Sequence, residues 1–261
     1  MITEYHRPQT LEEALKILSA SDTRPLGGGT VITHAGDESF ALVDLQSLGL
    51  DKLHKSGNTL NIGATVTLQI LLESLHTAAA LKTALKLEAP LNLRNMGTVA
   101  GALVTCDGRS PFAAVMLALD AKLTIDHSPM TANPSPVVHG LTFLGDFLPS
   151  RQELLRSKLI TKIEIPLQTK LSFETVARSP ADKPIVCVAL AQWPSGRTRL
   201  VIGGWGSSPS LAMDGNDTSG LQLAARNAAH NAMDKWATAE YRSEVAAVLS
   251  KRCLYHILCD R

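Results

Sequence analysis

The chain lacks the features that mark several large protein classes. No run of about 18 apolar residues occurs among its 261 residues, so we expect no membrane span. The N-terminus, MITEYHRPQT, carries a glutamate and no apolar segment, which argues against a secretory signal and favours a soluble, cytoplasmic protein. The chain has 25 Lys and Arg residues and 24 Asp and Glu residues, so it lacks the excess of basic residues that is typical of nucleic-acid-binding proteins.

Cysteine and histidine are also too few or too scattered to form a recognisable metal site. The four cysteines, at positions 106, 187, 253 and 259, include no CxxC pair. We expect them to be buried as small apolar groups, and we expect no iron–sulfur cluster in this chain. The eight histidines show no HExxH or paired spacing. No Ser–His–Asp, Cys–His or paired-carboxylate set stands out, so we predict neither metal ligands nor catalytic side chains.

The sequence does contain regular apolar patterns, which predict a mixed α+β fold. Helices are predicted where apolar residues recur every three or four positions: 11–20, 68–75, 78–87, 111–121, 219–235 and 238–251. Strands are predicted in short runs rich in β-branched and apolar residues: 41–45, a hairpin at 52–64, 122–125, 159–167, 171–178, 184–193 and 198–206. Segment 93–111 shows no helical period, and 128–138 is predicted to be a loop. The pattern indicates an α+β front of about 150 residues followed by a module of sheet and helices.

Two glycine-containing segments are candidates for anion binding. Gly27-Gly28-Gly29 precedes Thr30 but lacks the lysine of a Walker A loop, and its spacing does not fit a dinucleotide fingerprint. Successive backbone N–H groups in such a turn can nevertheless converge on an anion. A similar Gly–Thr pair opens the segment 97–102. Each segment alone is typical of a structural turn, whereas the two together suggest a two-sided clamp on a pyrophosphate.

The order of motifs along the whole chain resembles the FAD-binding medium subunit of molybdenum hydroxylases, the carbon monoxide dehydrogenase, xanthine dehydrogenase and nicotinate dehydrogenase type. LGGGT is similar to the first flavin loop of that family, and LRNMGTVAGAL to the second. The other matching pieces follow in family order: TLEEALKIL, LVDL, LNIGATVTLQIL, FAAVMLALDA, LITKIEIP, ARSPAD and AEYRSEVAAVLSKRCL. Each segment alone is weak evidence for the family, but all of them occur in the order that the family has.

The resemblance implies a fold of two small α+β subdomains, residues 1–55 and 56–157, and a C-terminal domain, 158–261, that has an antiparallel sheet with helices. FAD would extend between the subdomains. The residues implied to bind the cofactor are Gly27, Gly28, Gly29, Thr30, Val31, Thr98, Gly101, Ala102, Asp107 and Ile160. On the same ground we expect Gly28→Val to abolish FAD binding, by filling the space of the phosphate and resisting a positive φ.

The resemblance also implies partners. A large subunit would hold the molybdenum cofactor and a small subunit two [2Fe–2S] clusters, in a dimer of heterotrimers. This chain would receive electrons from the iron–sulfur subunit and pass them from FAD to an external acceptor.

Four positions depart from the family pattern. Ala100 and Ala102 replace a glycine and a polar side chain of the second loop. Pro111 stands where a carboxylate is usual, and Glu174 where a basic residue is usual. These departures motivate one alternative, a structural subunit that has lost FAD. A free-standing flavin oxidoreductase and a plain small-molecule-binding module are further alternatives.

A few remaining side chains have both a functional and a structural interpretation. Asp107 and Arg109 either touch the ribityl or adenine part of a flavin or form a solvated pair in a loop. Trp205 either stacks near a flavin or lines a subunit interface, or it packs in the core or on the surface. Tyr241 and Arg242 are expected to attach the last helix to the sheet.

Overall fold

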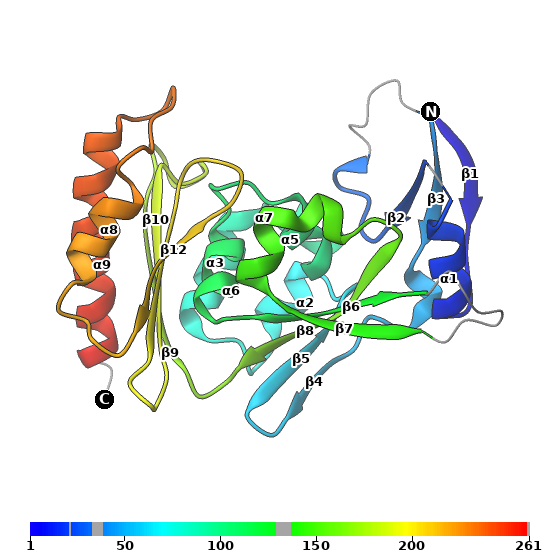
Figure 1. The fold of residues 1–261 in the computed structure, drawn as a ribbon, viewed down its shortest axis with the longest axis horizontal. Coiled ribbons are helices and arrows are strands. Elements are labelled where there is room, and N and C mark those ends of the chain that lie inside the picture. Colours follow the sequence, from blue (N-terminus) through cyan, green and yellow to red (C-terminus); the bar gives the residue numbers. More distant parts are fainter. Residues whose placement is uncertain (21, 33–38, 129–136, 260–261) are drawn as a thin grey trace. The chain divides into compact units, whose positions relative to one another are not determined.

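A computed structural model describes residues 1–20, 22–32, 39–128 and 137–259 (Figure 1). The chain forms two compact units, each built from several segments. The first contains Met1–Leu71, Leu91–Thr105 and Lys122–Glu164, and the second contains Leu72–Pro90, Cys106–Ala121 and Ile165–Arg261. Most of the loop predicted at 128–138 lies outside the described residues.

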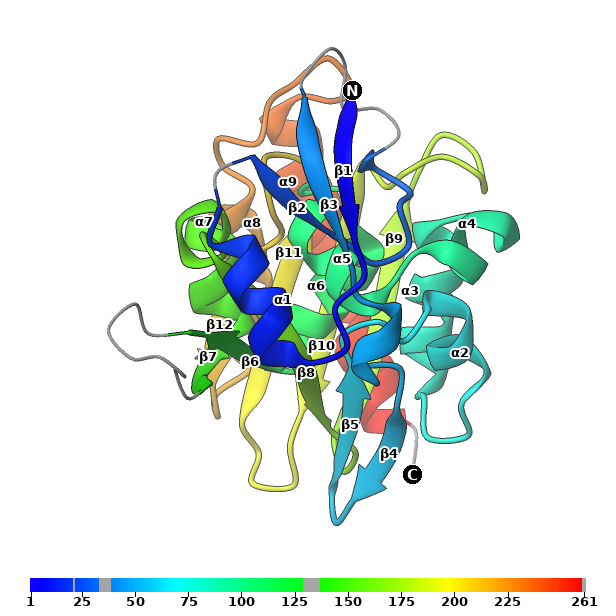
Figure 2. The same ribbon diagram turned by 90° about the vertical axis from the view of Figure 1, so that its right-hand side faces the viewer.

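The first unit begins with a small parallel sheet. Its strands are β1 (Ile2–His6), β2 (Thr23–Leu26) and β3 (Phe40–Asp44), in the order β1-β3-β2. Helix α1 (Leu11–Leu18) packs beside β2 and β3 (Figure 2). The Thr10 hydroxyl accepts a hydrogen bond from the Glu13 N–H at 3.2 Å and so caps the start of α1. The Glu13 carboxylate reaches back and accepts from the Gln9 N–H at 2.9 Å.

A second sheet of the first unit has the order β4-β5-β8-β6-β7. Its strands are β4 (Leu53–Ser56), β5 (Thr59–Gly63), β6 (Lys122–His127), β7 (Val138–Phe143) and β8 (Lys158–Pro166). β4 pairs antiparallel with β5, and β6 pairs antiparallel with both β7 and β8. The helices of this unit are short: η2 (Gln46–Leu48), α2 (Leu68–Glu73), α4 (Leu91–Met96), α5 (Val99–Thr105) and α7 (Leu144–Leu154).

The second unit is an antiparallel sheet covered by helices on both faces (Figure 1). The strand order is β12-β11-β10-β9, with β9 (Lys170–Val176), β10 (Val186–Gln192), β11 (Thr198–Gly203) and β12 (Ser210–Gly215). Helices α3 (Ala79–Glu88) and α6 (Pro111–Ala118) cover one face, and α8 (Leu221–Ala228) and α9 (Ala239–Cys259) cover the other. Because both faces are covered, every residue of β11 is buried. All eight residues of α6, which also packs against α3, are buried as well.

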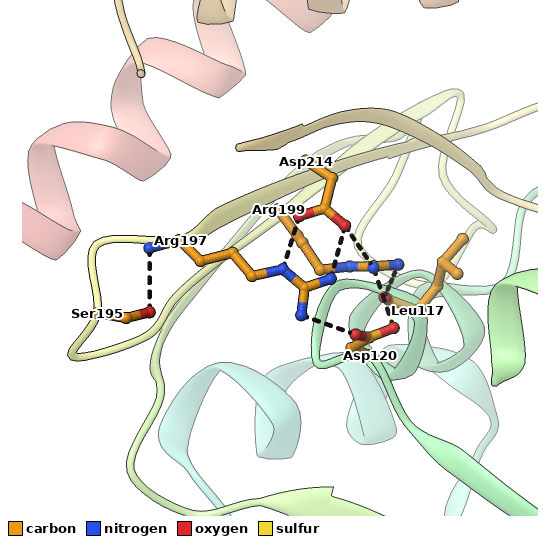
Figure 3. Close-up of polar contacts among 6 residues, drawn as sticks. All are labelled: Leu117, Asp120, Ser195, Arg197, Arg199 and Asp214. Atoms are coloured by element: carbon orange, nitrogen blue, oxygen red, sulfur yellow. Dashed lines mark hydrogen bonds and ion pairs between the residues drawn. The ribbon is translucent and has the colours of Figure 1, made fainter. Parts of the chain in front are cut away.

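An ion network ties the end of α6 to the neighbouring strands (Figure 3). The Arg197 guanidinium forms two 2.7 Å hydrogen bonds with Asp214 and an ion pair of 3.0 Å with Asp120. Arg199 is buried; it contacts both carboxylates and also donates to the Leu117 carbonyl. The network supplies charged partners for a guanidinium that would otherwise be costly to bury.

The predicted α+β class, with an antiparallel C-terminal sheet and helices, is confirmed. The prediction of no helix at 93–111 is wrong, because α4 and α5 lie there. Helices of six and seven residues are too short to show a clear apolar period, and Gly101 inside α5 weakens the pattern further. The helix predicted at 219–235 ends at Ala228, whereas the last helix runs on to Cys259.

Candidate cofactor-binding site

The two glycine segments lie against each other in the first unit. We call residues 27–31 the first glycine loop and residues 97–102 the second. A Cβ atom added to Gly28 would lie 1.8 Å from the Met96 carbonyl oxygen, and one added to Gly27 would lie 3.0 Å from Thr98 Oγ1. The Gly28 backbone therefore touches the backbone of Met96 and Gly97, where the second loop begins.

This contact corrects the reason for expecting Gly28 to be essential. The left-handed conformation belongs to Gly29, with φ of 70°, and not to Gly28. Gly28 has to be glycine because the backbone of the second loop occupies the place of a side chain.

The first glycine loop presents a row of unused donors. Within the described part of the chain, none of the N–H groups of residues 27–31 donates a hydrogen bond to a protein acceptor, and the Thr30 hydroxyl makes no hydrogen bond either. Glycine and turn conformations let such consecutive N–H groups converge on an anion. Residues 27–30 are only half-buried, so these donors are accessible to a phosphate or pyrophosphate.

The second glycine loop uses most of its own donors internally. Thr98 Oγ1 accepts from the Gly101 N–H at 3.1 Å, and the Thr98 carbonyl accepts from the Ala102 N–H at 2.9 Å. The N–H groups of Gly101 and Ala102 therefore donate hydrogen bonds within the first turn of α5. The Thr98 hydroxyl keeps its own proton as a donor.

A segment that the sequence analysis did not single out holds the second loop in place. The Leu68 N–H donates to the Gly97 carbonyl, and the Val99 N–H donates to the Val66 carbonyl, at 2.9 and 2.8 Å. The Ala100 N–H donates to the Ala64 carbonyl at 3.2 Å. Ala64, Val66 and Leu68 are all buried, so their alternating pattern was the available signal for an extended segment.

Ile160 lies in β8 and is 3% exposed, with its Cα paired to Ile125 of β6. The sheet itself accounts for its burial. Its contact with a flavin stays a prediction.

Asp107 belongs to the second unit, where it joins two loops. Its carboxylate accepts from the Arg109 N–H and pairs with Lys183 Nζ, both at 2.9 Å. The Arg109 guanidinium donates to the carbonyls of Lys183 and Pro184, and it stacks over the Trp236 ring at 4.8 Å. The two side chains therefore do not pair with each other: the Asp107 carboxylate pairs with Lys183, and the Arg109 guanidinium binds backbone carbonyls. A contact of Asp107 with the cofactor stays a prediction.

The glycines at 203–206 also have a packing explanation. A Cβ atom on Gly108 would lie 1.5 Å from the Trp205 carbonyl oxygen, and one on Gly204 would lie 2.0 Å from that of Ile185. The Gly108 N–H donates to the Gly206 carbonyl, and the Gly204 N–H donates to the Gly108 carbonyl. The segment therefore joins two loops of the second unit.

At the start of α6, the carboxylate of Glu88 binds the first residues of the helix. Pro111 is the first residue of α6, and Ser110 caps the helix. The Glu88 carboxylate accepts from the Ser110 hydroxyl at 2.7 Å and from the Phe112 N–H at 3.0 Å. Burial raises the pKa of the Glu88 carboxyl, although these two hydrogen bonds oppose the shift. Glu88 comes from α3, so no local motif points to it.

Glu174, the other departure, has a partner inside the second unit. Its carboxylate lies 3.5 Å from His256 Nδ1 of α9. Glu174 therefore faces the side of the sheet that α9 covers.

The remaining predictions concern metals, membranes and cysteines. Over the described ranges, no three His, Cys, Asp or Glu side chains are grouped so as to hold a metal ion. No helix in those ranges is both long and apolar enough to cross a membrane. Burial is confirmed for Cys106, Cys187 and Cys253 but is wrong for the exposed Cys259. Burial raises the pKa of the Cys187 thiol to about 12.

Comparison with known proteins gives related chains of similar length. The glyceraldehyde dehydrogenase medium chain of Sulfolobus acidocaldarius is 29% identical over 225 residues, 80% of this chain and 78% of that protein. The 6-hydroxypseudooxynicotine dehydrogenase complex subunit alpha of Paenarthrobacter nicotinovorans is 25% identical, over 96% of this chain and 93% of that protein.

Solved structures share the fold over nearly the whole chain. Quinoline 2-oxidoreductase from Pseudomonas putida 86 superposes with a TM-score of 0.79 at 22% identity, over 97% of this chain and 96% of that one. Carbon monoxide dehydrogenase from Hydrogenophaga pseudoflava superposes with a TM-score of 0.78 at 21% identity, over 98% of this chain and 96% of that one.

The family model described as the FAD binding domain in molybdopterin dehydrogenase matches residues 1–168, more than half of the chain. The chain therefore belongs to this family and is an FAD-binding oxidoreductase subunit.

Proposed function

We propose that this chain is the flavin subunit of a molybdenum hydroxylase complex, receiving electrons from an iron–sulfur partner and delivering them to an external acceptor. The observation that carries the proposal is that the two glycine loops lie against each other while the N–H groups of residues 27–31 have no acceptor among the residues that the structure describes. Such a row of donors beside the Thr98 hydroxyl fits the pyrophosphate of FAD. When bound, FAD supplies the redox chemistry, and the protein sets orientation and access.

Each loop has a separate task in this proposal. The first glycine loop binds the pyrophosphate through the backbone of Gly27, Gly28, Gly29 and Val31 and through both the backbone and the hydroxyl of Thr30. Thr98 sets the distance between the loops and donates its hydroxyl proton, while Gly101 and Ala102 line the second loop. Asp107 and Ile160 remain predicted contacts with other parts of the cofactor.

The names of the two relatives support a place in a complex, since one is a medium chain and the other a complex subunit. We propose a large partner that holds the molybdenum cofactor and a small partner that holds [2Fe–2S] clusters. The assembly as a dimer of heterotrimers, the three-part division at residues 55 and 157, and the cytoplasmic location stay predictions.

Flavin retention tests the cofactor part of the proposal. The purified full chain is reconstituted with FAD and freed of excess, and its visible flavin absorbance is measured per protein. We expect one FAD per wild-type chain. A wild-type protein that holds no flavin, although folded by circular dichroism, would overturn the proposal in favour of the FAD-deficient structural subunit.

Gly28→Ala gives the matched test of the cradle. The added methyl group would collide with the Met96 carbonyl, so the loops must separate, and we expect FAD affinity to fall by about 100-fold or more. Gly220→Ala is the control, because its Cβ would meet no atom within 4 Å and Gly220 has an ordinary φ of −88°. Equal FAD affinity in the two variants would contradict the cradle.

Co-purification tests the partner part. Tagged chain is expressed together with its candidate molybdenum and iron–sulfur partners, and the isolated material is analysed for molybdenum, iron and flavin. We expect all three in one complex. Turnover of a substrate by the isolated chain would instead support the free-standing oxidoreductase.

A further inference from the structure

Helix α9 carries an apolar stripe on the side that does not pack on the sheet. Its buried residues, which include Ala246, Leu249, Cys253 and Ile257, belong to the core that α8 and α9 form with β10 and β11. The apolar stripe consists of Tyr241, Val248, Tyr255 and Leu258, which are 46%, 49%, 65% and 59% exposed.

The spacing of the stripe is that of a helix-packing seam. Tyr241, Val248 and Tyr255 are seven residues apart, so they follow one another at every second turn along one line of the helix. Folding against the sheet does not use them, because the opposite face of α9 supplies that contact. Leu258 follows Tyr255 by three residues, so it lies beside this line, on one flank. Four large exposed apolar side chains so close together are more than isolated surface residues, and such patches mark interaction sites.

Charged residues flank the stripe in a pattern that suits a copy of the same helix. Glu244 and Lys251 each follow a stripe residue by three positions, so both lie on the same flank, two turns apart. The carboxylate of Glu244 is held by a bidentate pair with Arg226 of α8, at 3.0 and 2.8 Å, yet remains exposed. An acidic and a basic group therefore stand on one side of the stripe, on opposite sides of Val248 along the helix axis.

We propose that the apolar stripe docks on α9 of a second copy of this chain, with the two helices antiparallel and Val248 at the two-fold axis. In that arrangement Tyr241 lies opposite Tyr255 of the second copy, and Glu244 lies opposite Lys251 of the second copy. Both contacts occur twice, as a two-fold interface requires. A parallel arrangement would instead bring Glu244 against Glu244 and Lys251 against Lys251, which is repulsive.

The charge pattern favours a second copy over an unrelated partner. A self-complementary interface needs its acidic and basic groups at matching distances on the two sides of the symmetry axis. On one flank, Glu244 precedes Val248 by four residues and Lys251 follows it by three, so the two distances match to within one residue. Antiparallel packing also aligns the helix dipoles favourably.

Sedimentation of the full chain over a range of concentrations tests the interface. One helix pair is at the small end of specific interfaces, so we expect the wild type to dimerise at about 10 to 100 μM chain. Val248→Glu would place two carboxylates at the axis and should leave the chain monomeric over that range. Met233→Glu is the control, because Met233 is exposed (76%) outside the stripe, and it should dimerise like the wild type.

Charge reversal tests the antiparallel geometry. Glu244→Lys and Lys251→Glu should each weaken self-association by about tenfold, because two attractive contacts become repulsive. Mixing the two single variants should restore association, since each then offers the charge that the other lacks. Flavin content and thermal unfolding are measured alongside, and neither should change in Val248→Glu.

The proposal fails if the wild type is monomeric over the whole range of chain concentrations. The same result is expected if a different subunit, and not a second copy of this chain, covers the stripe. It fails equally if Val248→Glu dimerises as the wild type does. If the mixed charge variants associate no better than each variant alone, the antiparallel pairing is wrong.

Discussion

At the residue scale, Arg242 shows how a buried charge can fix a helix to a sheet. Its guanidinium donates to the carbonyls of Ile185, Ala232 and Gly204 and pairs with Asp234 at 2.8 Å. The predicted attachment of the last helix is confirmed for Arg242. Tyr241, its neighbour, points into the exposed stripe instead.

Arg242→Met should destabilise the protein by about 3–5 kcal/mol, because three buried carbonyls and a carboxylate lose their donor. The free energy of unfolding from urea titration checks this. Arg226→Met removes a guanidinium from the exposed pair with Glu244, so the free energy of unfolding should fall far less in this variant than in Arg242→Met. Similar losses for the two variants would contradict the assigned role of Arg242.

Thr98 is the second residue with a defined task. Thr98→Ala removes the acceptor of the Gly101 N–H and a contact of Gly27. We expect about 1 kcal/mol of lost stability, and FAD affinity about tenfold lower, because the spacing of the loops is no longer fixed. Fluorescence quenching of FAD on binding gives the affinity, and Thr98→Ser should restore it.

Thr105→Ala is the matched control for that prediction. Thr105 lies at the other end of α5, is exposed, and donates to the Gly101 carbonyl. FAD affinity should be unchanged in this variant. Equal losses at both threonines would show that α5 stability, and not the contact between the loops, controls binding.

At the residue scale, sequence information locates the glycine loops but does not explain Gly28. A glycine is required either by a positive φ or by a close neighbour, and the two causes look the same in a sequence. The neighbour of Gly28 is the Met96 backbone, far along the chain. Glu88 was missed for the same reason, since it reaches the start of α6 from another helix.

At the element scale, the ion network at the end of α6 links that helix to β11 and β12 (Figure 3). The hydrogen bond from Arg197 is the largest cause that lowers the pKa of the Asp214 carboxyl below its ordinary value of 3.8. A carboxyl whose pKa is lowered by folding stabilises the folded state above its unfolded pKa. That contribution is lost as the pH falls through the lower, folded value.

Asp214→Asn should therefore destabilise the protein on the order of 1 kcal/mol at neutral pH, and less as the pH falls below about 4. Unfolding free energies measured from neutral pH down to the acid limit of folding check this. Arg197→Met should flatten the same pH dependence, because it removes the main cause of the pKa shift. An Asp214→Asn effect that is constant with pH would contradict the role of the network.

Helices with several turns and strands with a clear alternation of apolar and polar residues were predictable from the sequence, and short elements were not. The hairpin β4–β5 was expected from its turn at Gly57, which does adopt a positive φ of 57°. Helix α5 was missed because the Thr98 hydroxyl and segment 64–68 hold its first residues in place, and its own apolar pattern is weak. Helix α4 was missed because six residues are too few to show an apolar period. The overlooked strand β12 depends on its pairing with β11.

At the scale of the whole molecule, the chain passes between the two compact units after Leu71, Pro90, Thr105, Ala121 and Glu164. The second unit therefore takes α3 and α6 from the middle of the sequence. These helices cover one face of the β9–β12 sheet (Figure 1).

The fragment 158–261 should consequently fold poorly when expressed alone. It retains β9–β12, α8 and α9 but lacks the helices that cover the second face of the sheet. We expect it to aggregate or to bind hydrophobic dyes, whereas the full chain should do neither. Adding back residues 72–121 in trans should increase its solubility. A soluble fragment with a cooperative unfolding transition would contradict this expectation.

The complete burial of α6 has a consequence for the time at which the protein is made. A ribosome adds about 5–20 residues per second, so Pro111–Ala118 waits on the order of ten seconds before β10 and β11 have been synthesised. During that interval the apolar helix has no sheet to cover it. The segment that is best protected in the finished protein is thus the one most open to aggregation, or to capture by a chaperone, while the chain is still being translated.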